Sequence, residues 1–406
     1  MRCGLLGRKL GHSYSPQIHA MLGNYEYLLY EKEPEALGDF LRSGEFDGLN
    51  VTIPYKKSVI PFCAELSETA REIGSVNTLL RRADGTLYGD NTDAFGFEST
   101  LRHSKIAVDG RKALVLGSGG ASVTACAVLK KLGARDVTVI SRTGENNYGN
   151  LSVHADAEII VNTTPVGMYP QNGEKAVDLR LFPRCCGVLD VIYNPARTAL
   201  VLQAEELGIP YAGGLLMLVA QAKRSSELFT GSTIADSEIA HIEAALQRQM
   251  QNIVIVGMPG SGKTTVANRL GEVLGRKIFD TDAEIVSRAG MDIPRIFEQF
   301  GEAHFRALET EVLRDAGKCS GLILSTGGGC VTREENYPLL HQNGVIVWVK
   351  RDTDRLARDG RPISLKSDMD QLYEKRRAFY ERFSDVSVDN NGSIEETVSR
   401  IREVLS

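Results

Sequence analysis

The sequence predicts an α/β protein whose strands form parallel sheets covered by helices. Apolar runs of strand length alternate with helix-length segments along nearly all of the 406 residues, and this alternation is typical of parallel α/β layers. Two glycine-rich loops each follow such a run, residues 117–120 after 113–116 and residues 257–264 after 253–256. A strand, a glycine loop and a helix in succession are the pattern of nucleotide binding, so the chain is expected to bind two nucleotides.

The composition is that of a soluble globular protein and argues against several classes. The length allows two or three domains. A net charge of −5 with dispersed Lys and Arg argues against nucleic-acid binding. No apolar stretch reaches the roughly 18 residues of a membrane helix, and the first residues do not resemble a signal peptide. Seven cysteines and seven histidines show no metal-ligand spacing, which predicts reduced thiols in a cytoplasmic protein without a protein-only zinc site. The oligomeric state is left open.

The N-terminal part divides into two predicted domains. Residues 1–104 begin with a strand at 3–6 and a helix at 16–22. Residues 105–212 form a second unit, and a helical tail at 213–249 is assigned back to the first domain. The strands expected in the second unit are 113–116, 137–140, 159–161 and 187–191.

The third predicted domain, residues 252–406, follows with hardly any linker. It contains five apolar strand candidates separated by amphipathic helices, which predicts a five-stranded parallel sheet. The strand candidates are 253–256, 277–280, 322–325, 345–349 and 385–389.

The second glycine loop has the sequence Gly-Met-Pro-Gly-Ser-Gly-Lys-Thr, which is the GxxxxGK[ST] pattern of triphosphate binding. Its backbone N–H groups and the following helix N-terminus can hold phosphate oxygens. Lys263 can reach the β- and γ-phosphates, and the hydroxyl of Thr264 can hold Mg²⁺. Asp280 and Asp282 end the next strand at the same sheet edge. One carboxylate near a metal and a second near an acceptor hydroxyl are what phosphoryl transfer requires.

Over essentially all of residues 252–406 the chain resembles the shikimate kinase family. The resemblance is carried by Asp-Thr-Asp at 280–282, Gly-Glu-x-x-Phe-Arg at 301–306, three glycines at 327–329, Arg-Pro at 361–362 and Arg376 with Tyr380. It implies a P-loop kinase domain that uses ATP and Mg²⁺, with Lys263 and Asp282 as catalytic residues. The implied shikimate ligands are Asp282, Arg306, Gly327, Gly328, Gly329 and Arg376; the implied ATP ligands are Gly257, Gly260, Ser261, Gly262, Lys263, Thr264, Thr265, Arg358 and Arg361; and the implied Mg²⁺ ligands are Thr264 and Asp280. The lid around 358–361 is several residues shorter than is usual for the family.

The first glycine loop is a weaker signal, but its context favours a dinucleotide. A helix is expected at 121–132, and the next strand ends in Ser141-Arg142-Thr143. NAD-binding proteins typically place an acidic residue there for the ribose 2′-hydroxyl. Arg142 suits a 2′-phosphate instead, so the sequence favours NADP(H) over NAD.

Segments upstream of this loop carry hydroxyl, amide and ammonium groups at strand and helix ends, which suit a polyhydroxylated ligand. They read GHSxSPxIH from Gly11, NVTxPxK from Asn50, VNT from Val76 and GDNTD from Gly89. With the GSGGAS loop, SRT, NTTPVGM from Asn162 and Gly213…Gln221, they resemble the shikimate dehydrogenase family across roughly residues 2–248. The resemblance implies an α/β substrate domain followed by a Rossmann-like NADP domain.

The same resemblance implies a catalytic pair of Lys56 and Asp93. A lysine beside a ketone can protonate the alkoxide that hydride addition leaves, and a nearby carboxylate can orient its ammonium group. The implied substrate ligands are Ser13, Ser15, Asn50, Thr52, Lys56, Asn77, Asp93, Tyr193 and Gln221. The assigned NADP ligands are Gly117, Ser118, Gly119, Gly120, Ala121, Ser141, Arg142, Thr143, Thr163, Met168 and Gly214.

The two resemblances together imply a bifunctional enzyme of aromatic amino-acid biosynthesis that acts on small-molecule substrates. It would reduce 3-dehydroshikimate to shikimate with NADPH and then phosphorylate shikimate with MgATP. One departure keeps alternatives open: residues 143–158 are too short for the helix and strand that the dehydrogenase family normally has there. This departure leaves open a kinase joined to a non-catalytic dehydrogenase-like module. A separate alternative is a dehydrogenase module that is specific for quinate.

Overall fold

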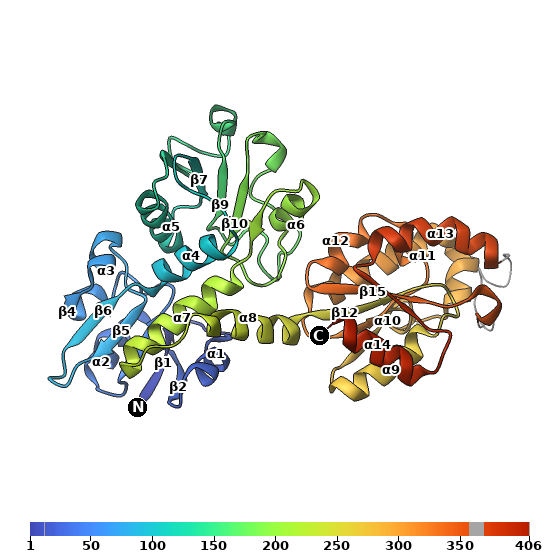
Figure 1. Cartoon of the computed structure of the whole chain (residues 1–406), viewed down its shortest axis with the longest axis horizontal. Coiled ribbons are helices and arrows are strands. Elements are labelled where there is room, and N and C mark those ends of the chain that lie inside the picture. The colour runs from blue at the N-terminus through green and yellow to red at the C-terminus, as the bar shows by residue number, and fades with distance from the viewer. Residues whose placement is uncertain (12, 357–368, 406) are drawn as a thin grey trace. The chain divides into compact units, whose positions relative to one another are not determined.

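The computed structural model describes residues 1–11, 13–356 and 369–405. The chain forms two compact units, Met1–Leu246 and Gln247–Ser406 (Figure 1). The predicted lid arginines, Arg358 and Arg361, lie outside the described residues. Within the described part of the chain no helix has the length and apolar character needed to cross a membrane.

Unit 1 begins with a six-stranded sheet in the order β2-β1-β3-β5-β6-β4. Most neighbours are parallel, but β5 runs antiparallel to both β3 and β6. This differs from the uniformly parallel layers that the sequence predicted. The cause is a hairpin between β5 and β6, where Asp84 Oδ1 accepts from the backbone N–H of Thr86 at 3.0 Å and Gly85 takes φ +84°. The strands are β1 (Arg2–Gly7), β2 (Glu26–Glu31), β3 (Gly48–Val51), β4 (Cys63–Leu66), β5 (Thr78–Arg81) and β6 (Leu87–Asp90).

The second sheet of unit 1 is parallel throughout and has the order β11-β10-β9-β7-β8. From β7 the chain goes first to β8 on one side and then to β9 on the other. In open α/β sheets ligands bind at such a switch point, outside the carboxyl ends of the strands. The strands are β7 (Lys112–Leu116), β8 (Asp136–Ile140), β9 (Ile159–Asn162), β10 (Gly187–Asp190) and β11 (Tyr211–Ala212).

Helices of unit 1 connect its two sheets. Two of them, α4 and α7, pack against each other, and Phe97 and Leu101 of α4 also belong to the buried cluster under the second sheet. Figure 1 shows α4 and α7 running between the two sheets. The helices are α1 (Ser15–Leu22), α2 (Leu37–Arg42), α3 (Glu68–Ile73), α4 (Thr92–His103), α5 (Gly120–Lys131), α6 (Ala199–Glu206) and α7 (Leu215–Thr230).

Unit 2 contains the predicted five-stranded parallel sheet, in the order β13-β14-β12-β15-β16. Separate apolar clusters cover its two faces, which is why its central strands read as continuous apolar runs. The strands are β12 (Asn252–Val256), β13 (Ile278–Asp280), β14 (Ile323–Ser325), β15 (Gly344–Lys350) and β16 (Val386–Asp389).

The helices of unit 2 include one long helix with a kink. In α11 the helical geometry is interrupted at Gly301, where φ is +79°, a conformation that favours glycine. A further helix, α8 (Ser237–Met250), enters unit 2 from unit 1. The others are α9 (Lys263–Leu274), α10 (Thr281–Ala289), α11 (Ile293–Lys318), α12 (Asn336–His341), α13 (Met369–Phe383) and α14 (Ile394–Val404).

Candidate active sites

The phosphate loop of unit 2 joins β12 to α9. Gly260 and Gly262 take φ values of +84° and +89°, so the loop needs glycine at both positions. Lys263 is the first residue of α9 and only 8% exposed. Its Nζ donates to the carbonyl oxygens of Gly257 at 3.0 Å and Met258 at 2.9 Å, so the ammonium group lies across the loop.

A group of oxygen atoms beside this loop fits the requirements of Mg²⁺. Thr264 Oγ1 donates to Asp280 Oδ2 at 3.1 Å and lies 3.1 Å from Ser325 Oγ. The other carboxylate oxygen of Asp280 accepts from the backbone N–H of Ala283 and caps α10. Mg²⁺ is usually held by one or two carboxylates together with substrate phosphates rather than by a full protein cage. Among the described residues there is no group of three or more His, Cys, Asp or Glu side chains that could hold a metal ion.

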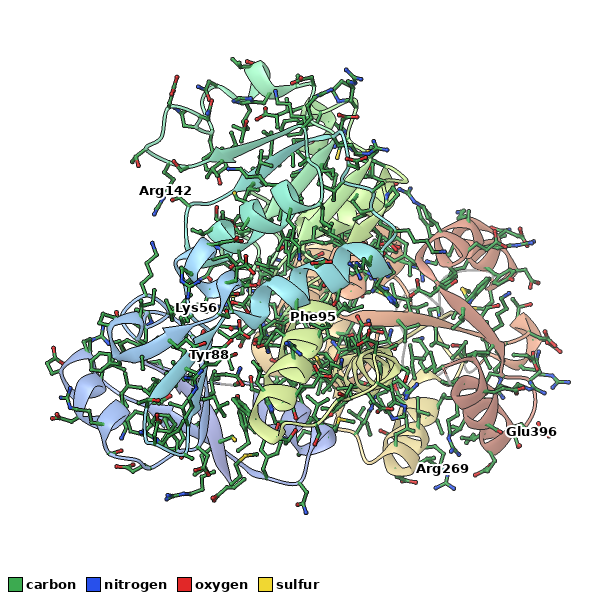
Figure 2. All side chains as sticks on the ribbon, turned by 60° about the vertical axis from the view of Figure 1, so that its left-hand side comes forward. Lys56, Tyr88, Phe95, Arg142, Arg269 and Glu396 are labelled. Atoms are coloured by element: carbon green, nitrogen blue, oxygen red, sulfur yellow. The ribbon has the colours of Figure 1, made fainter. Side chains whose placement is uncertain are left out.

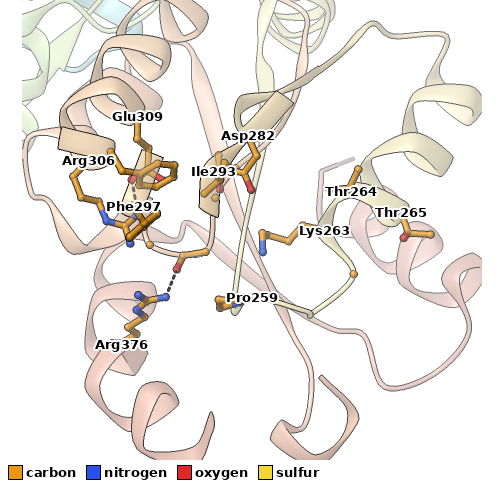
Figure 3. Close-up of a pocket in the computed structure, with 16 residues that line it drawn as sticks. Pro259, Lys263, Thr264, Thr265, Asp282, Ile293, Phe297, Arg306, Glu309 and Arg376 are labelled. Carbon is orange, nitrogen blue, oxygen red and sulfur yellow. Dashed lines mark hydrogen bonds and ion pairs between the residues drawn. The ribbon is translucent and has the colours of Figure 1, made fainter. Parts of the chain in front are cut away.

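Next to the phosphate loop lies a cavity of about 260 Å³ (Figure 3). It collects all six residues that the sequence predicted for the kinase substrate. Asp282 comes from the start of α10, Arg306 from α11 and Arg376 from α13. These side chains, the three glycines at 327–329, Lys263, Thr264 and Thr265 all line one cavity. Predicted residues from Gly262 to Arg376 are thus brought together around one cavity.

Glu309 is a cavity residue that the sequence predictions missed. Its side chain is fully buried and Oε2 accepts from Arg306 Nη1 at 2.8 Å. Burial raises the pKa of Glu309, while the charge of Arg306 lowers it and that of Asp282 raises it. The signal was available, because Glu309 stands three positions after Arg306 and therefore on the same helix face. Arg306 also contacts Glu302 at 3.2 Å, so two carboxylates orient its guanidinium.

The three glycines allow the cavity wall to approach these arginines. A Cβ at Gly329 would lie 2.1 Å from Arg306 Nη2, and one at Gly328 would lie 2.7 Å from Pro259. The carbonyl oxygen of Gly328 accepts from Arg376 Nη1 at 3.1 Å and from the Tyr380 hydroxyl at 2.5 Å. The resulting wall presents backbone amides and two guanidinium groups, which suit a carboxylate or hydroxyl ligand.

The predicted catalytic pair of unit 1 is in contact. Lys56 Nζ donates to Asp93 Oδ2 at 2.5 Å, and both side chains are largely buried. Lys56 follows β3, and Asp93 lies in the first turn of α4. Figure 2 shows Lys56 between the elements of the first sheet and those of the second. The carboxylate therefore orients an ammonium group that faces the space between two sheets.

A buried hydrogen-bond network lies under this pair. Thr78, Thr92 and Ser225 place three hydroxyl groups within 3.0–3.1 Å of one another. Asn77 Oδ1 accepts from the backbone N–H of Thr92 at 2.7 Å and from the hydroxyl of Thr78 at 3.1 Å. The amide of Asn77 is thereby held in one orientation, with its NH₂ group unpaired among the described residues.

Asn50, a predicted substrate ligand, belongs to the same network. Its Nδ2 donates to Ser225 Oγ at 2.7 Å, and its Oδ1 accepts from the Tyr27 hydroxyl at 2.8 Å. Both ends of this buried amide are therefore engaged within the protein. Ser225, which the sequence predictions missed, stands four positions after Gln221 in α7 and so shares its helix face.

The remaining predicted substrate ligands come from several elements and loops of unit 1. Ser13 Oγ accepts from the backbone N–H of Ser15 at the start of α1. Gln221 Nε2 donates to the carbonyl oxygen of Leu218 at 2.9 Å. Tyr193 packs edge-to-face on Tyr14 with ring centroids 6.0 Å apart. Thr52 directly follows β3, one residue after Val51.

The first glycine loop lies at the switch point of the second sheet, between β7 and α5. Gly117 takes φ +104°, and a Cβ there would lie 2.9 Å from the side chain of Thr164. Thr163 Oγ1 donates to the carbonyl oxygen of Leu116 at 2.7 Å. A Cβ at Gly120 would meet only Lys56, at 3.9 Å from its Cδ. The loop is thus in contact with residues 163–164 and is adjacent to the predicted catalytic pair.

The other assigned NADP ligands differ in how far they are exposed to solvent. Gly214 is the N-cap of α7, where a Cβ would lie 2.1 Å from the carbonyl oxygen of Val191. Met168 is 43% exposed. Ser118, Gly119 and Gly120 are exposed, Ala121 and Ser141 are partly buried, and Arg142 and Thr143 are exposed.

Residues 141–158 contain no α-helix and only one short 3-10 helix, Leu151–His154. Asparagine side chains organise the segment instead. Asn150 Oδ1 accepts from the backbone N–H of Asn147 at 2.9 Å, and Asn150 Nδ2 donates to the carbonyl oxygen of Glu145 at 2.8 Å. Asn146 Oδ1 lies 3.0 Å from Nε2 of His154. The short segment is therefore a loop held by hydrogen bonds between its own residues. Arg142 is exposed at its start (Figure 2).

A buried carboxylate holds the loop that follows β9. Asp190, at the end of β10, is fully buried and accepts from Thr198 Oγ1 at 2.7 Å and Asn162 Nδ2 at 3.0 Å. Asn162 Oδ1 in turn accepts from the Thr164 hydroxyl at 2.7 Å. Burial raises the pKa of Asp190 from 3.8 to about 6. The segment that follows β9 is therefore connected to this buried carboxylate through Asn162.

We expect this carboxylate to make unit 1 less stable as the pH rises from about 4 to about 6. The pKa is higher in the folded than in the unfolded state, so folding favours the protonated form. Its stabilisation is present below about pH 4 and is lost above about pH 6, an effect of about 3 kcal/mol. Asp190→Asn should lack this loss. Urea unfolding at pH 4.5 and 7.0, followed by circular dichroism, checks the difference.

Unit 2 supplies the control for this experiment. The only tryptophan of the chain, Trp348, lies in β15, so its fluorescence reports the unfolding of unit 2 alone. That transition should have the same pH dependence in both proteins. The transition of unit 1, followed by circular dichroism, should differ in its pH dependence between the wild type and Asp190→Asn. An identical pH dependence would contradict the role given to Asp190.

Comparisons with known proteins match both units. The shikimate dehydrogenase substrate-binding domain matches residues 5–79, and shikimate kinase matches residues 259–406. An NADP⁺-dependent shikimate dehydrogenase of Clostridium perfringens is 34% identical over 265 residues, which are 60% of this chain and 97% of that protein.

Solved structures agree for the N-terminal part. A chorismate mutase/shikimate 5-dehydrogenase fusion protein from Clostridium acetobutylicum is 36% identical with a TM-score of 0.58, over 60% of this chain and 96% of that one. Shikimate 5-dehydrogenase from Thermus thermophilus, in complex with NADP(H) and shikimate, is 30% identical with a TM-score of 0.55. The match covers 60% of this chain and 99% of that one. The chain therefore belongs to the shikimate dehydrogenase family and also carries a shikimate kinase domain, so that one polypeptide is an NADP-dependent dehydrogenase and an ATP- and Mg²⁺-dependent kinase.

Proposed function

We propose that the protein catalyses two consecutive reactions, the reduction of 3-dehydroshikimate to shikimate and the phosphorylation of shikimate at its 3-hydroxyl. The observation that carries this proposal is the pairing of each nucleotide loop with a polar site for a small molecule. The first loop adjoins Lys56 and Asp93. The second shares a cavity with Asp282, Arg306 and Arg376. The proposed domains are 1–104 with 213–249, 105–212 and 252–406.

In the dehydrogenase, Lys56 is proposed to act as the general acid. Its ammonium group would donate a proton to the carbonyl oxygen of the substrate, and Asp93 at 2.5 Å would orient it and offset its charge. Ser13, Ser15, Thr52, Asn77 and Gln221 would bind the substrate hydroxyls and carboxylate, with Tyr193 against the ring. Asn50 would keep Asn77 oriented through Ser225 and Thr78. When bound, NADPH supplies the hydride, and the residues that would hold it are those of the loop, Arg142 and residues 163–168.

In the kinase, Asp282 is proposed as the base for the acceptor hydroxyl, because it enters the cavity beside Lys263 (Figure 3). Arg306 and Arg376 would hold the shikimate carboxylate, and Glu309 would keep Arg306 in place. Lys263 would stabilise the charge of the transferring group. When bound, ATP with Mg²⁺ supplies the phosphoryl group, and Thr264 and Asp280 would hold the metal.

A single spectrophotometric experiment tests both steps. Purified protein with 3-dehydroshikimate and NADPH should consume NADPH, and addition of MgATP should then produce a shikimate phosphate. Quinate in place of shikimate in the reverse reaction tests the alternative specificity. Consumption of ATP without any NADPH-dependent reduction, together with no NADPH binding, would instead identify the N-terminal half as a non-catalytic module.

We expect Arg142→Gln to weaken NADPH binding by about 10–100-fold, because a phosphate loses a charge-assisted hydrogen bond. Binding of NADH, which has no 2′-phosphate, should change little. Fluorescence titration with both cofactors measures the difference. Equal losses for NADPH and NADH would show that the substitution disturbs the loop at 141–158 rather than a phosphate contact.

A further inference from the structure

Arg351, which has no role in the proposed function, lies against the phosphate loop of unit 2. Arg351 directly follows β15, and β15 pairs in parallel with β12, which leads into the loop. Both strands therefore end at the same sheet edge. A Cβ at Gly262 would lie 3.5 Å from Nη1 of Arg351 and 3.1 Å from Nδ2 of Asn390. The guanidinium is thus next to the last glycine of the phosphate loop.

The guanidinium of Arg351 has no polar partner in the part of the chain that the structure describes. Its Nε is buried and makes no hydrogen bond there. The neighbouring arginines are different: Arg355 donates to the carbonyl oxygen of Asn391, and Arg400 donates to the carboxylate of Asp389. A buried cationic donor without a partner is unfavourable. An anion bound beside it would gain a strong hydrogen bond.

The backbone around Arg351 is held in place by the loop after β16. The backbone N–H of Asp352 donates to Asn391 Oδ1 at 3.0 Å. Buried Asn390 donates from Nδ2 to the carbonyl oxygen of Ser261 at 2.6 Å and accepts from Thr397 Oγ1 at 2.7 Å. The phosphate loop, the end of β15 and the loop after β16 are therefore connected. Arg351 does not line the shikimate cavity, whereas Gly262 does, so the position points to the nucleotide and not to the acceptor.

We propose that Arg351 is a nucleotide-binding residue that pairs with the phosphates of ATP and ADP. The guanidinium of Arg351 is then a second positively charged side chain at this loop, in addition to the ammonium group of Lys263. The planar guanidinium can donate two parallel hydrogen bonds to phosphate oxygens, which a backbone amide cannot do. This proposal rests on the kinase function proposed above.

Calorimetric titration of the full-length protein with ADP and Mg²⁺ tests the proposal without turnover. Arg351→Gln keeps much of the side-chain stem and removes the charge. It should weaken ADP binding about tenfold, with the KM for shikimate nearly unchanged. Removal of one phosphate-pairing cation should also make ADP binding less sensitive to salt. Arg351→Lys should recover part of the affinity.

The matched control is Arg269→Gln on α9. Arg269 pairs with Glu272 at 2.9 Å at the surface of the same unit (Figure 2), and its replacement should leave ADP binding unchanged. Trp348 fluorescence during thermal unfolding verifies that each variant is folded. ADP affinity within twofold of wild type in folded Arg351→Gln, or a loss with unchanged salt sensitivity, would overturn the proposal. A wild-type protein that binds no ADP would instead overturn the kinase function itself.

Discussion

Replacement of Lys56 by methionine is expected to lower the turnover of 3-dehydroshikimate reduction by about 10²–10⁴-fold, the usual contribution of a positioned general acid. Methionine keeps the length of the side chain beside Gly120 but cannot donate a proton. Lys56 is held by Asp93 at 2.5 Å, so the loss concerns proton transfer more than binding. Steady-state kinetics with NADPH should show a reduced kcat and a nearly unchanged KM.

The kinase unit is the internal control for this variant. Phosphorylation of added shikimate by Lys56→Met should proceed at the wild-type rate, because Lys263 and its cavity belong to a different unit. If another acid in the site donated the proton, Lys56→Met would keep a near-normal kcat. That result would remove Lys56 from the mechanism.

Replacement of Lys263 by methionine is expected to lower the rate of shikimate phosphorylation by about 10²–10³-fold, as for the loss of one charge-stabilising donor. Lys263 is only 8% exposed, and its ammonium group donates to two carbonyl oxygens of the phosphate loop. Its loss removes a positive charge and also loosens the loop, so ADP binding should weaken as well. A coupled assay for ADP release at saturating ATP measures the rate.

Here the dehydrogenase is the control. Lys263→Met should oxidise NADPH with 3-dehydroshikimate at the wild-type rate. Together the two lysine variants form a reciprocal pair, each inactive in one reaction and active in the other. Loss of both activities in either variant would indicate misfolding of the chain, and full kinase activity in Lys263→Met would contradict the role of this lysine.

The strands of unit 2 could be predicted to within one or two residues, because most of them are buried and read as apolar runs. β12, β14 and β15 are examples. By contrast, β2 was not predicted. It is an edge strand with Leu28 and Leu29 about 40% exposed, so it lacks the alternation of a half-buried strand. The β5–β6 hairpin was also missed, although Asp84-Gly85 is a recognised turn signal.

The candidate sites could be predicted where a residue stands in a local motif and not where a contact joins distant segments. Lys56 and Asp93 lie in two such motifs, and the structure brings them into contact. Ser225 and Asn50 are 175 positions apart, and no local pattern indicates that a serine in α7 would hold an asparagine in β3. Glu309 and Arg351 were not predicted for the same reason. Glu309 is buried beside Arg306 and Arg351 lies beside Gly262, and a single sequence does not reveal such contacts.

The continuity of α8 determines how the two enzymes can be separated by truncation. Residues 237–246 of this helix belong to unit 1 and residues 247–250 to unit 2. Arg276, before β13, donates to the backbone carbonyl oxygen of Gln251 at 2.7 Å and also to that of Arg248. A kinase fragment that begins at Asn252 would lose both acceptors of this partly buried guanidinium. A fragment that begins in the segment between α7 and α8 keeps both acceptors with the kinase, but it also removes the buried side chains of Ile239, Ile242 and Leu246 from unit 1.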